Sequence, residues 1–246
     1  PRKFTSRFLA SFHYPEYRKL WSATMLAHSS AWALIVARGA LVLHLTGSAS
    51  WIGFVTFAAM IPSVFISPFA GYLADRFDRR TVLTYAYVLN LTTSVLLAIL
   101  VATDTVQPWH ILLLSIVNGC ARSTQIPATQ ALLPNTVPSQ RIVNAVALYQ
   151  VTQNGARFLG PLLILVVLVV TEREDWVFFL CATLYAVGLV ITLNIRTVST
   201  GVVETGAGLR VIGRNILAGL RHMYTEPLVL SIILLVVAHC GMTMSF

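Results

Sequence analysis

The sequence predicts an all-α membrane protein, and three observations favour that fold class. Of its 246 residues, 57% are apolar and only 11% are charged, whereas a soluble domain carries about 25% charged residues. The mean hydropathy is +0.76. Apolar runs of roughly 20 residues recur along the chain, which is the length that crosses a bilayer as a helix. A membrane barrel would need short alternating strands, and these runs are continuous.

The apolar runs predict six full spans and the start of a seventh, in one polytopic chain. We expect a cytoplasmic N-terminal segment over 1–19, a six-helix transmembrane bundle over 20–195, a cytoplasmic linker over 196–226 and the start of a seventh helix over 227–246. Because the chain ends inside that last apolar run, we expect it to be part of a longer polypeptide. The six full spans are predicted over 20–45, 51–73, 82–103, 109–133, 142–170 and 176–195.

The distribution of basic residues predicts which side of the membrane each connector faces. The connectors "TGSAS" and "TDTVQP" carry no Lys or Arg, whereas the connectors that alternate with them are basic. Excess Lys and Arg marks the cytoplasmic face, so the N-terminus is predicted to be cytoplasmic. This segregation favours a bacterial-type inner membrane over a nucleic-acid partner as the reason for the net charge of +8. The residues on the basic side are Arg2, Lys3, Arg7, Arg18, Lys19, Arg76, Arg79, Arg80, Arg141, Arg196, Arg210, Arg214 and Arg221.

Within the linker, the stretch 209–221 places apolar residues at helical spacing and arginines on the opposite face. This pattern predicts an amphipathic helix, either on the cytoplasmic membrane surface or packed against protein. Six spans followed by a cytoplasmic linker and further spans is a recurring plan of transporters built from two bundles.

The stretch "GYLADRFDRR" lies between the second and third spans and identifies a family. It resembles the signature loop between the second and third helices of the major facilitator superfamily, with Asp78 in place of the second glycine of that pattern. The resemblance covers essentially the whole chain and implies a major facilitator-like six-helix bundle. It assigns a gating role to Gly71, Asp75, Arg76, Arg79 and Arg80.

Physical chemistry gives this loop a reason to combine glycine, acid and arginine. A glycine lets two helices approach closely, and Asp75 at a helix end can pair with arginines and with the positive N-terminus of a neighbouring helix. Such a latch would hold the cytoplasmic side closed in one state of a transport cycle. The alternative is that the charges only set the topology, which would require arginines alone.

A second resemblance lies in the fifth span, in "QNGARFLGPLL". Ala156, Gly160 and Pro161 match the small residue and Gly-Pro pair of the superfamily's antiporter-associated motif, which implies a helix-packing role; generic packing is the alternative. The order of features from 118 to 161 also resembles the drug- and siderophore-exporter branch.

Three arginines lie inside predicted spans, and they are the candidate substrate-binding residues together with neutral polar neighbours. An arginine at mid-bilayer costs roughly 2.5 to 3.5 kcal/mol on insertion scales, so Arg38, Arg122 and Arg157 should face a cavity or a partner. Their spans line the central cavity in the resembled superfamily, and no acid lies deep in any of the six spans. We expect an anionic solute there; the alternative is pairing with carbonyls or with acids elsewhere. Hydrogen bonds would come from Asn118, Gln125, Gln153 and Asn154.

The sequence therefore predicts secondary active transport by alternating access, with export of a small amphipathic or anionic organic solute. A second six-helix half, in the same or another chain, would complete the transporter. The alternative is a transport-inactive structural subunit of a larger membrane complex. No phosphate loop, metal-ligand spacing or nucleophile elbow is present, so neither an enzyme nor a cofactor or metal site is expected. His28 and His44 could titrate near neutrality, or be structural.

Overall fold

The computed structural model describes residues 9–76, 78–171 and 173–197, together with positions 231 and 235, and for 67–76 it describes the backbone alone. The chain divides into two compact units, Pro1–Val202 and Val203–Phe246. The predicted amphipathic helix over 209–221 lies outside the described residues. So does the predicted seventh span, apart from Ser231 and Leu235, which are helical.

A short 3-10 helix, η1 (Ala10–His13), is followed by six long α-helices. Short 3-10 turns, η2 (Leu133–Thr136) and η3 (Ser139–Arg141), connect the fourth and fifth of these. No strand occurs among the residues that the structure describes, and the predicted all-α bundle is confirmed. The long helices are α2 (Pro15–Thr46), α3 (Ala49–Arg76), α4 (Arg79–Ala102), α5 (Pro108–Leu132), α6 (Ile142–Thr171) and α7 (Asp175–Leu193).

Five of these helices are long and apolar enough to cross a membrane, and α5 is the exception. Polar side chains recur along α5 at intervals of three or four residues, at Ser115, Asn118, Arg122 and Gln125, and they lower its mean hydropathy. Residues at these spacings share one face of a helix. In a lipid environment such a polar face must lie against protein or a cavity.

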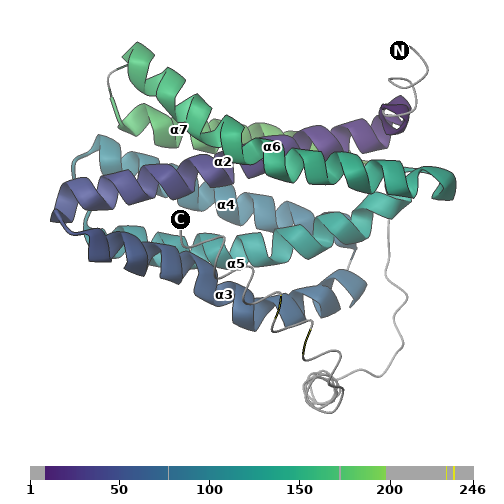
Figure 1. Ribbon diagram of the computed structural model, residues 1–246, viewed down its shortest axis with the longest axis horizontal. Coiled ribbons are helices and arrows are strands. Elements are labelled where there is room, and N and C mark those ends of the chain that lie inside the picture. The colour runs from purple at the N-terminus through teal and green to yellow at the C-terminus, as the bar shows by residue number, and fades with distance from the viewer. Residues whose placement is uncertain (1–8, 77, 172, 198–230, 232–234, 236–246) are drawn as a thin grey trace. The chain divides into compact units, whose positions relative to one another are not determined.

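The helices that follow one another in the chain are not the ones that pack most closely. α5 lies between α3 and α4, and α2 lies between α6 and α7, while α4 packs along α7 and joins the two groups (Figure 1). α3 and α4 have little contact with each other, although a single short connector joins them. The central position of α2 and α5 places their polar residues inside the bundle.

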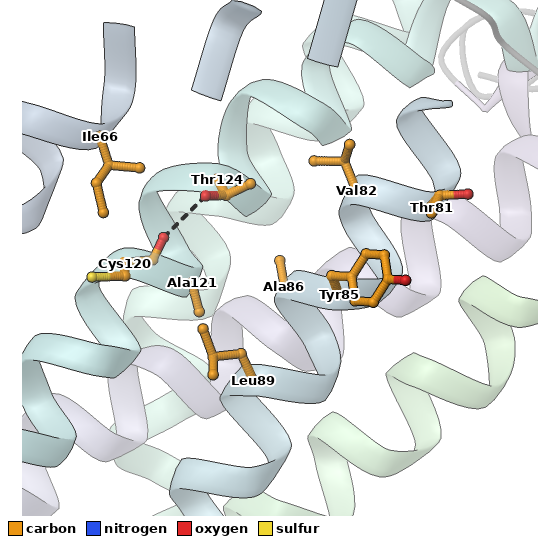
Figure 2. Close-up of a pocket in the computed structure, with 9 residues that line it drawn as sticks. All are labelled: Ile66, Thr81, Val82, Tyr85, Ala86, Leu89, Cys120, Ala121 and Thr124. Atoms are coloured by element: carbon orange, nitrogen blue, oxygen red, sulfur yellow. Dashed lines mark hydrogen bonds between the residues drawn. The ribbon is translucent and has the colours of Figure 1, made fainter. Parts of the chain in front are cut away.

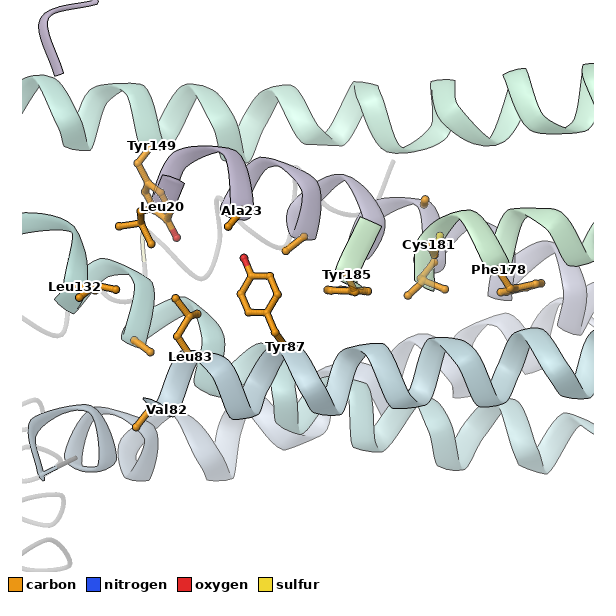
Figure 3. Packing of buried hydrophobic residues seen from close by; sticks show 14 of the residues in the cluster. Leu20, Ala23, Val82, Leu83, Tyr87, Leu132, Tyr149, Phe178, Cys181 and Tyr185 are labelled. Atoms are coloured by element: carbon orange, nitrogen blue, oxygen red, sulfur yellow. The ribbon is translucent and has the colours of Figure 1, made fainter. Parts of the chain in front are cut away.

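Large aromatic side chains fill the space where α2, α4 and α7 meet (Figure 3). The rings of Tyr87 and Tyr185 form an edge-to-face pair with centroids 6.4 Å apart. Tyr17, at the first turns of α2, is buried and donates from its hydroxyl to the backbone oxygen of Ala145, 3.0 Å away. This hydrogen bond joins the beginning of α2 to the beginning of α6.

Several basic connectors meet at one end of the bundle. Arg79 donates to the backbone oxygen of Ala131 over 2.8 Å, at the end of α5, and Arg80 donates to that of Leu193, at the end of α7. Lys19 donates to the backbone oxygen of Asn194 over 2.8 Å. The last carbonyl groups of a helix lack partners within the helix, and cations near them are favourable. The basic side chains therefore cap the C-terminal ends of helices in addition to carrying charge.

Candidate functional site

The charged stretch 71–80 forms the end of α3, a connector of two residues and the start of α4, and the structure describes side chains only from Asp78 on. For Gly71, Asp75 and Arg76 the structure describes the backbone alone, so their gating role stays a prediction. Asp78 is the N-cap of α4, and its carboxylate accepts from the Arg80 backbone N–H at 3.4 Å and from the Thr81 hydroxyl at 3.0 Å. Aspartate is among the strongest N-caps. The residue that departs from the family pattern thus begins the next helix.

The candidate packing residues lie where α6 crosses α2. Ala156 is fully buried, and a Cβ added at Gly160 would lie 2.7 Å from the backbone nitrogen of Ala33 and 2.7 Å from the backbone oxygen of Ser29. Real Cβ contacts are almost never that short, so only glycine permits this crossing. Pro161 follows inside the helix. The stretch therefore brings two helix backbones into contact, whatever its further role.

Arg38 is the most deeply buried of the three candidate arginines, with 3% of its surface exposed. Its Nη1 donates to Oδ1 of Asn118 at 3.3 Å and to the hydroxyl of Ser115 at 3.5 Å, both on α5. Its Nε and Nη2 are buried without a hydrogen-bond partner among the described residues. A buried guanidinium with two unpaired donor nitrogens is a place where an anion or ordered water would be stabilised.

Arg122 and Arg157 converge on one aromatic ring. The guanidinium carbon of Arg122, on α5, lies 5.6 Å from the ring centroid of Trp32, and that of Arg157, on α6, lies 5.1 Å from it. Both distances are within the range of a cation–π contact. Trp32 is on α2, so a single indole holds two cations from two other helices close together. Two neighbouring guanidinium groups with no acid between them favour a shared anion.

The amides of the candidate site behave differently from one another. Gln125 is buried and accepts at Oε1 from the Nδ2 group of Asn90, 3.0 Å away on α4. Asn154 is exposed, and its Nδ2 donates over 2.9 Å to the backbone oxygen of Gln150 in its own helix. The structure thus joins Gln125 to the interior network, whereas the hydrogen bond of Asn154 stays within α6.

None of Arg38, Arg122 and Arg157 forms an ion pair with a described carboxylate. The ion pairs of the described region join Lys19 to Glu16 and Arg173 to Asp175, near helix ends. Among the described residues, the buried Arg38 is balanced by neutral hydrogen bonds, and the partly buried Arg122 and the exposed Arg157 by an indole ring. That arrangement suits recognition of negative charge from outside the chain.

His28 shares this interior. Its Nδ1 donates to the backbone oxygen of Thr24 at 2.9 Å, and its ring contacts that of Tyr149 edge-to-face, 6.1 Å between centroids. Because a carbonyl oxygen only accepts, the Nδ1 position carries the proton. His44 is exposed near the end of α2. These two contacts favour the alternative that His28 has a structural role.

A cavity of about 380 Å³ lies between α3, α4 and α5 and contains none of the candidate site residues. Figure 2 shows its lining, in which the hydroxyl of Thr124 is bonded to the Cys120 backbone oxygen 3.1 Å away. With that hydroxyl occupied, the lining is almost wholly apolar. Its chemistry differs from that of the arginine-bearing interior.

Sequence reasoning missed Trp32 and Asn90. Trp32 is the one tryptophan away from a span end, and Asn90 is a lone amide in the middle of the third span. A strongly polar group at mid-span is the signal that could have identified Asn90, because such groups require a partner in lipid.

Comparison with known proteins gives the family. The family described as "Transmembrane secretion effector" matches residues 6–244. The staphyloferrin A transporter of Staphylococcus aureus is 23% identical over 185 residues, which are 75% of this chain and 46% of the relative. An uncharacterized transporter of the major facilitator type, YfiS of Bacillus subtilis, is 27% identical over 103 residues, which are 42% of this chain and 24% of that protein.

Solved structures show the same fold. A crystal structure of the peptide transporter POT has a TM-score of 0.61 and 17% identity, covering 92% of this chain and 47% of the other. A POT family transporter in complex with 5-aminolevulinic acid has a TM-score of 0.58 and 15% identity, over 94% and 47% of the two chains. The chain spans about half the length, or less, of these relatives. It belongs to the transmembrane secretion effector family, within the major facilitator superfamily of membrane transporters.

Proposed function

We propose that this chain forms the N-terminal half of a secondary transporter that exports a small anionic or amphipathic organic solute by alternating access. The family and its relatives support membrane transport. The solute class rests on one observation: the guanidinium groups of Arg38, Arg122 and Arg157 have no described carboxylate partner, although Arg38 is buried and Arg122 partly buried, while Arg157 is exposed on α6. A second six-helix half would supply the opposite wall of the solute site.

In this proposal, the charged stretch 71–80 at the junction of α3 and α4 is the cytoplasmic latch. Arg79 and Arg80 already hold the ends of α5 and α7, so this stretch moves with this bundle as one body. Asp75 then acts on the other half, where a helix N-terminus would attract its charge. The protein lies in a bacterial-type inner membrane with its N-terminus in the cytoplasm, as the excess of basic residues on one side indicates.

Transport in vesicles tests the solute class. The protein, expressed from its complete reading frame, is reconstituted with an imposed proton gradient, and two solutes are offered. These are staphyloferrin A, after which one relative is named, and propane-1,2,3-tricarboxylate, a simple polyanion. We expect Arg38→Gln, Arg122→Gln and Arg157→Gln each to lower the initial rate at least about tenfold, because each removes a charge-assisted hydrogen bond. Arg→Lys variants should retain part of the rate, since they keep the charge.

Arg173→Gln is the matched control, because Arg173 pairs with Asp175 near a helix end and outside the interior. This variant should transport at the rate of the unmodified protein. The transport rate is measured separately for the two orientations of the reconstituted protein, and the comparison distinguishes export from uptake. A triple Gln variant that moves both solutes at full rate would refute the role of the arginines, and an unmodified protein that moves no anion would refute the solute class.

A further inference from the structure

Four polar side chains form a continuous hydrogen-bonded chain through the interior of the bundle. Arg38 on α2 donates to Asn118 Oδ1 at 3.3 Å, Asn118 Nδ2 on α5 donates to Asn90 Oδ1 at 2.6 Å, and Asn90 Nδ2 on α4 donates to Gln125 Oε1 at 3.0 Å. Every member is buried: the exposed fractions are 3% for Arg38, 7% for Asn118, 0% for Asn90 and 4% for Gln125. Three helices are thus joined by amides that have little access to water.

The direction of every hydrogen bond in this chain follows from its first member. A guanidinium has five N–H donors and no acceptor, so Asn118 must turn its oxygen to Arg38 and its nitrogen to Asn90. Asn90 therefore accepts with its oxygen and donates with its nitrogen. Gln125 accepts in turn, and its own Nε2 group donates to no described residue.

The groups left unused at the two ends of the chain are all donors. At one end they are Nε and Nη2 of Arg38, which are buried without a partner among the described residues. At the other end they are the two hydrogens of Gln125 Nε2. A solute group that only accepts, such as a carboxylate, can satisfy donors of this kind. A group that must itself donate would leave its own hydrogens unpaired in a site of low polarity.

We propose that Asn90 is a positioning residue that transmits the hydrogen-bond direction fixed by Arg38 to Gln125 and so makes the solute site select carboxylates over neutral amides of the same shape. This inference rests on the proposed anion site. Asn90 has no exposed surface and so acts through Asn118 and Gln125. Its side chain accepts from Asn118, which Arg38 orients, and donates to Gln125, which fixes Gln125 in a single orientation.

The selectivity of binding tests this role, with two probes of matched shape: propane-1,2,3-tricarboxylate and its triamide. Binding to the complete protein in lipid nanodiscs is measured by calorimetry, which does not depend on transport. The unmodified protein should bind the tricarboxylate at least about tenfold more tightly than the triamide. In Asn90→Leu, Gln125 loses the donor that fixes its orientation and is free to turn, so the preference should fall by about tenfold.

Asn90→Asp is the second variant, and it is nearly isosteric with asparagine. Its second oxygen would accept from Gln125, which would turn the Gln125 oxygen outward in place of the nitrogen. We expect the preference for the tricarboxylate to disappear, since an acceptor and a negative charge then replace a donor. Asn90→Leu made in an Asn118→Leu, Gln125→Met background should change the preference no further, because its partners are already absent.

Thr93→Val is the matched control. Thr93 is equally buried on α4, and its hydroxyl bonds only to the backbone oxygen of Asn90 at 2.9 Å, within its own helix. The preference of the Thr93→Val protein for the tricarboxylate should equal that of the unmodified protein. An unmodified protein that does not prefer the tricarboxylate would overturn the anion site and this inference with it. A clear preference that survives in both Asn90 variants would overturn the role of Asn90 alone, as would equal weakening of both probes.

Discussion

Gly160 is the residue at which one hydrogen atom in place of a side chain decides how two helices meet. The backbone of α2 occupies the position that a Cβ would take, at Ala33 and Ser29. Gly155, five residues earlier on the same helix, has open space around the corresponding position. A side chain added at Gly160 would therefore clash with α2, whereas one added at Gly155 would not, and single substitutions can reveal this difference.

We expect Gly160→Ala to lower the free energy of unfolding by about 1–3 kcal/mol, because the added methyl group must push two backbones apart. Gly155→Ala should leave the stability unchanged or raise it by up to about 1 kcal/mol, since alanine favours the helix and meets nothing. Thermal unfolding of both variants in the same detergent measures the difference. Equal melting temperatures for the two would contradict the close crossing of α2 and α6.

The individual site residues could be predicted from the sequence only in part. An arginine within an apolar run is visible without a structure, and this signal identifies Arg38, Arg122 and Arg157. Their partners were not visible, because the contacts of Trp32 and Asn90 join residues far apart in the chain. The N-cap role of Asp78 was also missed, although Asp followed by a helix is a recognisable signal.

At the scale of the helices, the ends of α5 and α7 depend on side chains from the start of α4. Arg79 donates to the backbone oxygen of Ala131, and Arg80 donates to that of Leu193. Each arginine thereby caps the C-terminal end of a helix. The last turn of a helix frays when its carbonyl groups lack partners. The order of α7 near Leu193 should therefore be sensitive to a residue more than a hundred positions away.

We expect Arg80→Ala to increase amide hydrogen exchange in the last turn of α7 several-fold, because the Leu193 oxygen loses its donor. Exchange in the middle of α7 should remain slow. Arg141→Ala is the control, since Arg141 is also basic and exposed on a connector. Mass-spectrometric exchange of the complete protein in nanodiscs resolves the two regions, and equal rates in both variants would show that the bond to Leu193 contributes nothing.

The residue ranges of the helices could be predicted closely from the sequence, whereas the choice of which helices pack against one another could not. Apolar runs set the six ranges to within a few residues, with the largest difference at α2, which begins at Pro15 rather than near residue 20. Charged residues at Glu16, Arg18 and Lys19 concealed that first turn, because a run of apolar residues ends where charges begin. The pairing of α3 with α5 depends on a close approach at Gly119, where an added Cβ would collide with the backbone of Ala59, and no periodicity encodes this contact.

At the scale of the whole bundle, the hydrogen bonds place the basic connectors at one end, and topology is the prediction that follows. In a protein whose Cys120, Cys181 and Cys240 are replaced by alanine, we expect Glu174→Cys to react with a membrane-impermeant maleimide in intact cells. Arg141→Cys should react only after the membrane is opened, because basic connectors face the cytoplasm. Both positions are exposed in the structure. Labelling of both residues from the same side would contradict the six-span topology.

The buried partners of Arg38 also have a consequence for biogenesis. Ser115 and Asn118 follow Arg38 by 77 and 80 residues, so the ribosome completes α2 well before their codons are read. During that interval the nascent segment holds a cation that lipid solvates poorly. The insertion machinery, or the translocation channel itself, would have to shelter α2 until α5 emerges. Release of this segment into the bilayer would then wait on the synthesis of a later one.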